Sequence, residues 1–508
     1  MRNTVTQGQG PNSHPQQVLI DLCLNSLCNR DKYSGAGEKE DAARKSTLED
    51  CGLPVLRLLA HICEAIRNQQ GNYNLLLRRC TDLIALANER FYAFPFKDVP
   101  NCWRDLYREA SLLKVSLLAT KKIWRPTPAA AHTRCQEIDK ITPMLDITMD
   151  ELVRTLDMAL IMAGPPSDAT TKTGITQVFD ALLQCHLEGI EHDNYPPSKR
   201  RKLGSPETVS NQDRFPKSYA FVPSCSSLIP KMSEPSFDKF EAHILHPHDE
   251  NLGPEPVIIA NALEYWPAVK ERPWKSPAYL LSKTIGGRRL VPIETGRSYV
   301  DEGWGQKIIT FKDFMNQYIL LDPPPSSLAS GYLAQHNLFS QIPSLRLDIT
   351  IPDYCYTNPP PPHYTSPLAS KHAELPQLEE PLLNAWFGPA GTISPLHTDP
   401  YHNILAQVVG RKYIRLYAPR ESEKLYARGL EDGGIDMGNT SATDVGVLAG
   451  WDGTDEEQAA AHNKFPLFKT AKFVDCILEE GECLYIPIGW WHYVRSLSVS
   501  FSVSFWFN

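Results

Sequence analysis

Two side chains within SPLHTDPYHNILAQVVGRKYIRLYAP, residues 394–419, are of the types that bind metal ions. His397 and Asp399 stand two positions apart, and alternate residues of a β-strand point to the same face. A neutral imidazole and a carboxylate are suitable ligands for a divalent first-row transition metal. Because two ligands are too few for a stable site, a third should lie elsewhere in the chain.

The candidate for the third ligand is His492, which lies in the aromatic segment IPIGWWHYVRSL. An imidazole without a partner in such a strand-forming context would be costly. Two histidines and one carboxylate form the facial triad of non-haem Fe(II) oxygenases, which leaves coordination positions open. The alternative for His492 is a hydrogen-bonded core histidine. His402 and His363 show how easily a histidine occurs in this part of the chain.

A lysine within an apolar strand indicates a second binding group beside the metal. Lys412 has the same parity as Ile414, so its side chain should point inward. A buried ammonium needs an anion, and we interpret that anion as the distal carboxylate of 2-oxoglutarate. An internal salt bridge and a snorkelling side chain are the alternatives. Asn403, an even number of residues after His397, could face the same cavity if the strand is unbroken, and Ser394, expected just before the strand, offers a hydroxyl.

The elements that must position these side chains form a strand-rich half, from about residue 216 onward. Segments such as EPVIIAN, KYIRLYAP and ECLYIPIGWWHYVRSL are short, β-branched or aromatic, and interrupted by Gly and Pro. In the last run, SVSFSVSFWFN, apolar residues alternate with serines, which predicts one apolar and one polar strand face. Many short strands of this kind predict a sandwich or a small barrel, with helices such as TFKDFMNQYIL outside it.

The preceding half reads as helical over residues 46–191. LPVLRLLAHICEAIRNQQ, YNLLLRRCTDLIALANERFYAF, CWRDLYREASLLKVSLLATKKI and MDELVRTLDMALIMAG carry apolar residues at intervals of three and four. No repeat period is readable, so we expect an irregular helical domain with a stabilising or interaction role. Residues 1–45 are expected to form a disordered tail.

A linker is expected over residues 192–215, where HDNYPPSKRRKLGSPETVSNQDRFP is rich in proline and charge. Its basic cluster consists of Lys199, Arg200, Arg201 and Lys202. Such a cluster, kept exposed by flanking prolines, resembles a nuclear localisation signal that an import receptor reads. The alternative is an ordinary solvated linker.

Length and composition limit the class of protein. A chain of 508 residues is too long for one ordinary core, so at least two domains are expected. The net charge of −8 gives no reason to expect nucleic acid. We see no bilayer-spanning apolar run and no secretory signal. Twelve scattered cysteines are typical of reduced thiols in a nuclear or cytosolic protein.

Longer motifs point to a known family. WFGPAGTISPLHTDPYHNILAQVVGRKYIRLYAP and GECLYIPIGWWHYVRSLSVSFSVSFWFN resemble Jumonji-C (JmjC) oxygenases. More narrowly, they resemble the JmjC-domain-containing protein 5 group, proposed as lysine demethylases and as arginyl hydroxylases. GYLAQHNLFSQIPSLRLDITIPDYC fits the same group. The resemblance covers residues 216–508 densely and reaches weakly into the helical half through FKDVPNCWRDLYREASLL.

The resemblance implies an α+β multidomain fold. An N-terminal α-helical domain would precede a double-stranded β-helix, the cupin-like jelly roll of JmjC proteins, with flanking helices. His397, Asp399 and His492 match the iron ligands of the family. The implied cofactor is Fe(II), with 2-oxoglutarate and O2 as co-substrates.

The resemblance also implies a co-substrate pocket and a substrate pocket. The residues that match the 2-oxoglutarate pocket are Tyr332, Ser394, Asn403 and Lys412. Glu294 and Trp386 match the substrate-pocket wall of arginyl hydroxylases. A buried carboxylate can accept a guanidinium bidentately, and an indole can cover its face; for Trp386, simple core packing is an equal alternative. The segment 428–463 is longer than the family pattern and is expected to form a surface insertion.

These features favour a 2-oxoglutarate-dependent protein oxygenase that hydroxylates a basic side chain of a protein or peptide, with arginine favoured because of Glu294. Demethylation of methyl-lysine, for example in a histone, follows from the same chemistry and is the first alternative. A non-enzymatic nuclear scaffold is the second alternative, but it would not need both Lys412 and Asn403. A metal-dependent peptidase is the third, and it would leave the 2-oxoglutarate pocket without a purpose.

Overall fold

The structure, a computed structural model, describes residues 15–27, 47–94, 98–121, 141–166, 169–193, 214–216, 221–250, 252–301, 303–322, 330–431 and 434–508. The basic cluster at residues 199–202 lies outside these ranges. The chain divides into two compact units. The first comprises residues 1–206 with Arg288–Leu290, and the second comprises residues 207–287 and 291–508.

The first unit is helical, as predicted. Its longer helices are α1 (Pro15–Leu22), α2 (Leu53–Asn68), α3 (Tyr73–Phe91), α4 (Asn101–Thr120), α5 (Ile141–Ala163) and α6 (Ala169–Asp193), with short helical turns η1 (Cys23–Leu27) and η3 (Leu48–Cys51). The four segments with apolar spacing are confirmed as α2 to α5. In α2, for example, Leu59, Ile62 and Ile66 follow this spacing, and all three are fully buried.

The prediction of a disordered tail over residues 1–45 is wrong for residues 15–27. This segment is helical, and its Leu19, Cys23 and Leu27 are buried. The polar residues on both sides of this short stretch suggested disorder. Its few apolar side chains are nevertheless buried, and composition alone does not reveal that. The remainder of residues 1–45 lies outside the described ranges.

The second unit is built on strands. They are β1 (Lys231–Ser233), β2 (Val257–Ala260), β3 (Leu290–Thr295), β4 (Gly305–Thr310), β5 (Gly331–His336), β6 (Leu382–Gly388), β7 (Ile393–Thr398), β8 (His402–Val409), β9 (Lys412–Tyr417), β10 (Leu430–Glu431), β11 (Ile435–Asp436), β12 (Phe473–Leu478), β13 (Cys483–Ile486), β14 (Trp491–Ser496) and β15 (Ser500–Phe507). β3 begins within the Arg288–Leu290 segment of the first unit.

Short helices accompany these strands. They are α7 (Phe237–Leu245), α8 (Pro277–Lys283), α9 (Phe311–Phe314), η7 (Met315–Ile319), α10 (Leu338–Gln341), α11 (Pro343–Arg346), η9 (Asp353–Tyr356), α12 (Ala369–Ala373), η10 (Pro419–Leu425), α13 (Val445–Leu448), α14 (Asp455–Lys464) and η11 (Phe468–Thr470). Part of the segment TFKDFMNQYIL is confirmed as helical, in α9 and η7.

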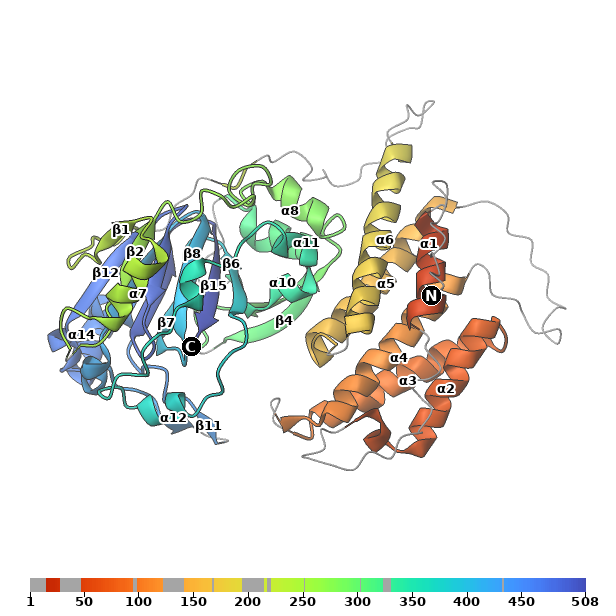
Figure 1. The fold of residues 1–508 in the computed structure, drawn as a ribbon, viewed down its shortest axis with the longest axis horizontal. Helices are drawn as coiled ribbons and strands as arrows, with labels where there is room; N and C mark the ends of the chain where they lie inside the picture. Colours follow the sequence, from red (N-terminus) through yellow and green to blue (C-terminus); the bar gives the residue numbers. More distant parts are fainter. Residues whose placement is uncertain are drawn as a thin grey trace, which may run out of the picture. The chain divides into compact units, whose positions relative to one another are not determined.

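Two sheets make up the double-stranded β-helix. The large sheet has the order β1-β2-β13-β8-β15-β6-β5-β3-β4, and the small sheet has the order β12-β9-β14-β7. From β2 through β3 the neighbouring strands of the large sheet pair antiparallel, as do those of the small sheet, whereas β1 and β2 are parallel. Figure 1 shows the strands β6, β8 and β15 near the middle of this unit, with β7 and β12 drawn alongside. The predicted fold class is therefore confirmed.

The alternation in the C-terminal run has a consequence that the sequence did not reveal. The apolar face of β15, with Phe501 and Phe505, packs in the main core against helices such as α7 and α9. The serine face is also fully buried, at Ser500, Ser502 and Ser504. Two of these hydroxyls take part in hydrogen bonds with Gln407, and the third accepts one from an indole. The polar face therefore points into the β-helix, not to solvent.

The segment 428–463 is not only a surface insertion. Within it, Thr440, Ser441, Thr443 and Val445 are buried. The backbone N–H of Ser441 donates to the carbonyl of Leu396 (2.8 Å), and the N–H of Thr398 donates to the carbonyl of Asn439 (2.9 Å). These bonds satisfy the free edge of β7, which explains why the inner part of the insertion is ordered against the sheet. The helix α14, by contrast, buries none of its residues.

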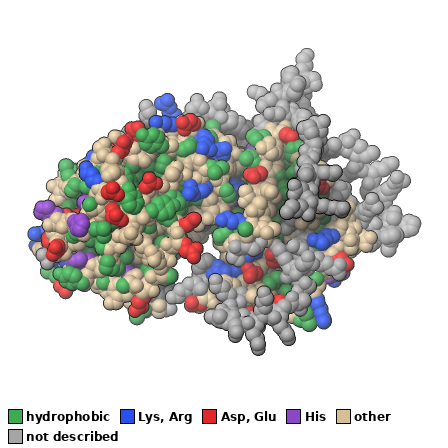
Figure 2. Space-filling model, viewed as in Figure 1, with side chains coloured by type: hydrophobic (Ala, Val, Ile, Leu, Met, Phe, Trp, Pro, Cys, Tyr) green, Lys and Arg blue, Asp and Glu red, His purple; other side chains and the backbone are tan. Residues whose placement is uncertain are grey.

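Two general expectations can be compared with the described residues. The cysteines among them carry free thiols. None of the helices described is both long enough and apolar enough to cross a membrane. On the face drawn in Figure 2, basic and acidic side chains are interspersed across the described surface.

Candidate metal centre and its pocket

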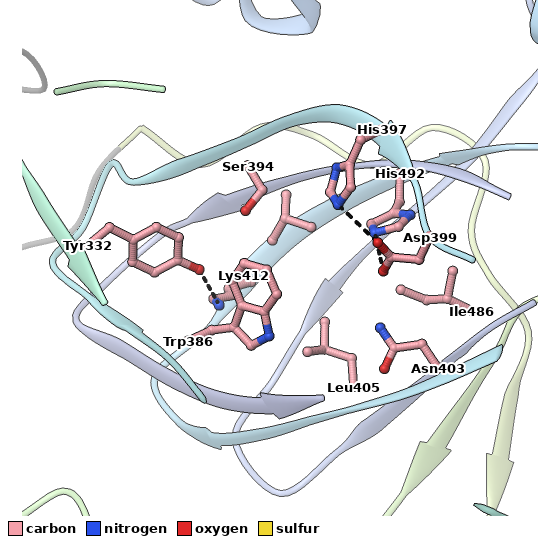
Figure 3. A pocket seen from close by; sticks show the side chains of 11 residues that line it. Tyr332, Trp386, Ser394, His397, Asp399, Asn403, Leu405, Lys412, Ile486 and His492 are labelled. Carbon is pink, nitrogen blue, oxygen red and sulfur yellow. Dashed lines mark hydrogen bonds and ion pairs between the residues drawn. The ribbon is translucent and has the colours of Figure 1, made fainter. Parts of the chain in front are cut away.

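Three side chains from two strand ends meet at one point, as the sequence predicted. One donor atom each from His397, Asp399 and His492 lies within 4.8 Å of the others. The Nε2 atom of His397 is 3.7 Å from Oδ1 of Asp399, and Nε2 of His492 is 3.5 Å from Oδ2. His397 and His492 face each other across the β7–β14 pair, and their ring centroids are 4.1 Å apart. The long-range pairing of these strands brings the two histidines together (Figure 3).

Backbone carbonyls orient both imidazoles. Nδ1 of His397 lies 2.7 Å from the carbonyl of Pro395, and Nδ1 of His492 lies 3.2 Å from the carbonyl of Trp490. If each Nδ1 carries the proton and donates it to its carbonyl, each Nε2 keeps its lone pair for a ligand. Such outer hydrogen bonds are the usual means of fixing the tautomer of a metal-binding histidine.

The electrostatics of the cluster favour metal-binding protonation states. Burial, together with the neighbouring His492, lowers the pKa of His397 to about 4, so this imidazole is neutral at physiological pH. Burial acts to raise the pKa of Asp399, but its hydrogen bond with His492 and the charges of nearby histidines outweigh burial and lower it. Two imidazoles and one carboxylate are a donor set that fits Fe(II).

The predicted reason for the position of Asp399 needs a correction. β7 ends at Thr398, so Asp399 lies one residue beyond the strand. Its carboxylate still lies beside the ring of His397, with Oδ1 3.7 Å from Nε2. Ser394, predicted to lie just before the strand, is its second residue.

Lys412 is fully inside the β-helix, as its parity predicted. Its ammonium nitrogen lies 3.3 Å from the hydroxyl of Tyr332, which accepts its hydrogen bond. No carboxylate among the described residues forms an ion pair with it, so the alternative of an internal salt bridge does not hold there. Burial lowers the pKa of Lys412 to about 7. A buried amine in this state is suited to an incoming anion.

The other predicted co-substrate residues, Tyr332, Ser394 and Asn403, line the same pocket, and Figure 3 shows Asn403 on the side of the metal cluster. Asn403 reaches it from β8, a different strand from β7, so the assumption of an unbroken strand is wrong. Its Oδ1 atom is buried without a hydrogen-bond partner. An unpaired acceptor and an amine without a carboxylate on the walls of one pocket fit a polar ligand that supplies their missing partners.

Trp386 both lines the pocket and packs in the core, the two alternatives considered for it. Its ring lines the pocket and lies 6.1 Å, between centroids, from the ring of Tyr332. Its indole N–H donates to the hydroxyl of Ser504 over 3.0 Å. The ring therefore has its polar atom satisfied by the core while one face remains available to a ligand.

Glu294 is not among the residues that line this pocket. It lies on β3, directly opposite Tyr332 in the β3–β5 pair. Burial raises the pKa of its carboxyl group, and a hydrogen bond from the Trp304 side chain partly offsets that effect. None of the described Lys or Arg side chains forms an ion pair with it.

The remaining histidines near the motif have structural roles. His402 is buried, and its two ring nitrogens lie within hydrogen-bond distance of the Tyr485 hydroxyl (2.8 Å) and the Pro360 carbonyl (3.0 Å). His363 contacts Thr365 and a backbone carbonyl. Neither belongs to the metal cluster.

Sequence reasoning missed several residues of the pocket. Leu405, Ile486 and Val494 form its apolar lining. Leu405 stands two positions after Asn403, and Val494 two after His492, so strand parity could have identified both.

Comparison with known proteins agrees with this geometry. The family model described as "Cupin-like domain" matches residues 249–508. Lysine-specific demethylase 8 of Xenopus tropicalis is 41% identical over 440 residues, covering 84% of this chain and 87% of that protein. Lysine-specific demethylase JMJ30 of Arabidopsis thaliana is 43% identical over 260 residues, 51% of each chain. The human bifunctional peptidase and (3S)-lysyl hydroxylase JMJD7 is 24% identical over 264 residues, covering 50% and 77%.

A cupin fold with this His-Asp-His cluster defines a class of mononuclear metal proteins. Within that class, the chain belongs to the cupin-like JmjC family. It is a 2-oxoglutarate-dependent oxygenase, and members of its family use Fe(II) and 2-oxoglutarate. The scaffold alternative is therefore set aside.

Proposed function

We propose that this chain hydroxylates an arginine side chain of a protein or peptide. Glu294 carries the proposal: it is a half-buried carboxylate with a raised pKa and, among the described residues, no cationic partner. A guanidinium could pair with it through two parallel hydrogen bonds, which an ammonium cannot match. Trp386 would cover a face of the substrate side chain.

In this proposal, His397, Asp399 and His492 hold Fe(II). Tyr332, Ser394, Asn403 and Lys412 hold 2-oxoglutarate: the Lys412 ammonium and the Tyr332 hydroxyl would bind its distal carboxylate. The bound iron, with O2 and 2-oxoglutarate, supplies oxidation of a C–H bond while the co-substrate becomes succinate and carbon dioxide. The chain positions the target carbon and excludes water, since Leu405, Ile486 and Val494 give the pocket an apolar lining.

Demethylation of methyl-lysine is the second candidate. It is favoured by the names of the relatives from Xenopus tropicalis and Arabidopsis thaliana, which are lysine-specific demethylases. A histone would then be a possible partner. Peptidase activity stands in the name of the human relative, but an anion pocket built around Lys412 has no role in hydrolysis.

The test is incubation of the iron-loaded protein with 2-oxoglutarate and matched peptides that carry arginine or methyl-lysine. Hydroxylation adds the mass of one oxygen atom. Demethylation removes the mass of a methylene group and releases formaldehyde. Oxygen addition to the arginine peptide supports the proposal, and formaldehyde release from the methyl-lysine peptide alone replaces it with demethylation.

We also propose that the protein acts in the nucleus, because the basic cluster Lys199, Arg200, Arg201 and Lys202 suits an import receptor. The flanking prolines support this, since they disfavour a helix around the cluster. A part of the protein in the cytoplasm is compatible with such a signal.

A further inference from the structure

The loop that follows Glu294 is joined to the insertion chiefly through charged groups. We propose that Arg297 is a positioning residue that fixes this loop, and thereby the substrate wall. The inference rests on the proposed function only in its choice of substrate. The groups involved form the Arg297 ion-pair network, which consists of Arg297, Asp301, Asp444, Asp452 and Arg495.

The guanidinium of Arg297 contacts three carboxylates. Its Nε donates to Oδ2 of Asp301 over 2.8 Å, within the loop itself. One Nη donates to Asp444 of the insertion, and the other lies 3.8 Å from Asp452. The Arg297 side chain is 21% exposed, so water screens these pairs less than it screens pairs at an open surface.

The network continues to the strand that carries His492. Asp452 accepts two contacts, at 2.8 and 3.0 Å, from Nη1 of Arg495. Arg495 lies on β14, three residues after the histidine. The network therefore joins three segments that are distant in sequence: the loop after β3, the insertion and β14.

A cavity makes the ion pairs important. It has a volume of about 130 Å³ and lies between the loop, at Ser298 and Asp301, and the insertion, at Ser441 and Thr443. The hydroxyl of Ser298 is buried there without a hydrogen-bond partner. Because a hollow takes the place of close packing between the loop and the insertion, the position of the loop depends strongly on the contacts of Arg297.

The loop carries side chains that face the substrate wall. Tyr299 is largely buried, and its hydroxyl lies 3.5 Å from that of Thr440 in the insertion. The nearby carboxylates of Asp399 and Glu294 both act to raise the pKa of its hydroxyl, which burial raises most. Trp304, at the end of the loop, contributes the hydrogen bond to Glu294. A displaced loop would thus move the groups that surround Glu294 while the metal cluster stays in place.

The experiment compares wild type with Arg297→Met, Arg297→Lys and Asp444→Asn. Arg272→Met is the matched control, because Arg272 pairs with buried Asp348 (2.9 Å) outside the network. For each protein, KM and kcat are measured with an arginine peptide, and hydrogen–deuterium exchange is followed across the whole chain. Arg297→Met should raise KM by roughly ten-fold with little change in kcat. Arg297→Lys keeps the positive charge but loses the parallel N–H donors of the guanidinium, so its KM should lie between those of Arg297→Met and wild type.

Exchange gives a readout that does not require the correct substrate. Faster exchange confined to residues 296–301 and 439–445 in Arg297→Met, and absent in Arg272→Met, supports the proposal even if wild type never modifies arginine. Localised faster exchange together with unmodified arginine peptides would refute the proposed arginyl hydroxylation and leave the positioning role of Arg297 supported. Unchanged KM and unchanged exchange overturn the positioning role. Faster exchange throughout the second unit, β14 included, also overturns it, because Arg297 would then support the fold in general.

Discussion

The ammonium of Lys412 lies 3.3 Å from the hydroxyl of Tyr332 inside the β-helix. Burial lowers the pKa of the amine to about 7 and raises that of the phenol. Neither group can therefore supply the negative charge that would stabilise the ammonium. A buried ammonium beside a neutral phenol is energetically costly in the absence of a ligand. Both groups can donate hydrogen bonds to a bound carboxylate, which would stabilise the ammonium.

The first prediction concerns the affinity for 2-oxoglutarate. Lys412 is protonated below a pH of about 7 and loses its charge above it. The affinity of the iron-loaded protein should therefore fall as the pH rises through about 7, and binding above that pH should take up a proton. Calorimetry in buffers of different ionisation enthalpy measures both effects. In Lys412→Met the affinity should be low and without this proton uptake; strong, proton-coupled binding by the variant would contradict the assignment.

The second prediction concerns stability. Since the folded-state pKa of Lys412 is lower than its ordinary value of 10.5, the unfolded chain binds more protons between the two values. The contribution of Lys412 to the free energy of unfolding must then increase as the pH rises from about 7 toward 10.5. Lys412→Met should stabilise the ligand-free protein at neutral pH by a few kcal/mol. Denaturant unfolding of both proteins over this pH range is the measurement, and an equally or less stable variant would count against the buried amine.

The third prediction concerns the metal. A variant with both His397→Ala and His492→Ala should remain folded but lose iron binding and the conversion of 2-oxoglutarate to succinate, because one carboxylate cannot hold the ion. His363→Gln is the matched control, since the ring nitrogens of this histidine hydrogen-bond with Thr365 and a backbone carbonyl and it is not part of the metal cluster. Metal analysis and succinate quantification provide the readouts. Succinate formation by the double variant would show that the cluster is not the metal site.

The fourth prediction concerns localisation. Replacement of Lys199, Arg200, Arg201 and Lys202 by alanine should move the protein from the nucleus to the cytoplasm, because an import receptor would lose its cationic motif. Arg78→Ala with Lys121→Ala removes two exposed cations elsewhere and is the control. Fluorescence microscopy of tagged proteins shows the outcome. An unchanged distribution would leave the cluster as part of a solvated linker.

Strand parity and motif spacing predicted a part of the pocket, and the family resemblance added Tyr332 and Trp386. Parity and spacing identified His397, Asp399 and the inward-pointing Lys412, because these residues lie on or next to regular strands. Asn403 was assigned to the right cavity for the wrong reason: the chain turns between β7 and β8, and the side chain arrives from the other sheet.

Other features depend on contacts that no local pattern encodes. The serines of β15 look like a solvent face but point into the β-helix, where Gln407 and Trp386 hydrogen-bond with them. The contact between Tyr299 and Thr440 joins segments 141 positions apart. The edge pairing of the insertion with β7 likewise arises only once the strands have assembled, so the insertion was taken for a surface feature.

The most direct test of the proposed function is the reaction of an arginine peptide with wild type and with Glu294→Gln. Both proteins are loaded with iron, and peptide mass, succinate and 2-oxoglutarate affinity are measured in one preparation. Wild type should add one oxygen atom to the arginine peptide. Glu294→Gln should lose roughly 2–5 kcal/mol of substrate binding while its 2-oxoglutarate affinity and peptide-independent succinate formation persist. If wild type leaves every arginine peptide unmodified but releases formaldehyde from a methyl-lysine peptide, the proposed arginyl hydroxylation is wrong.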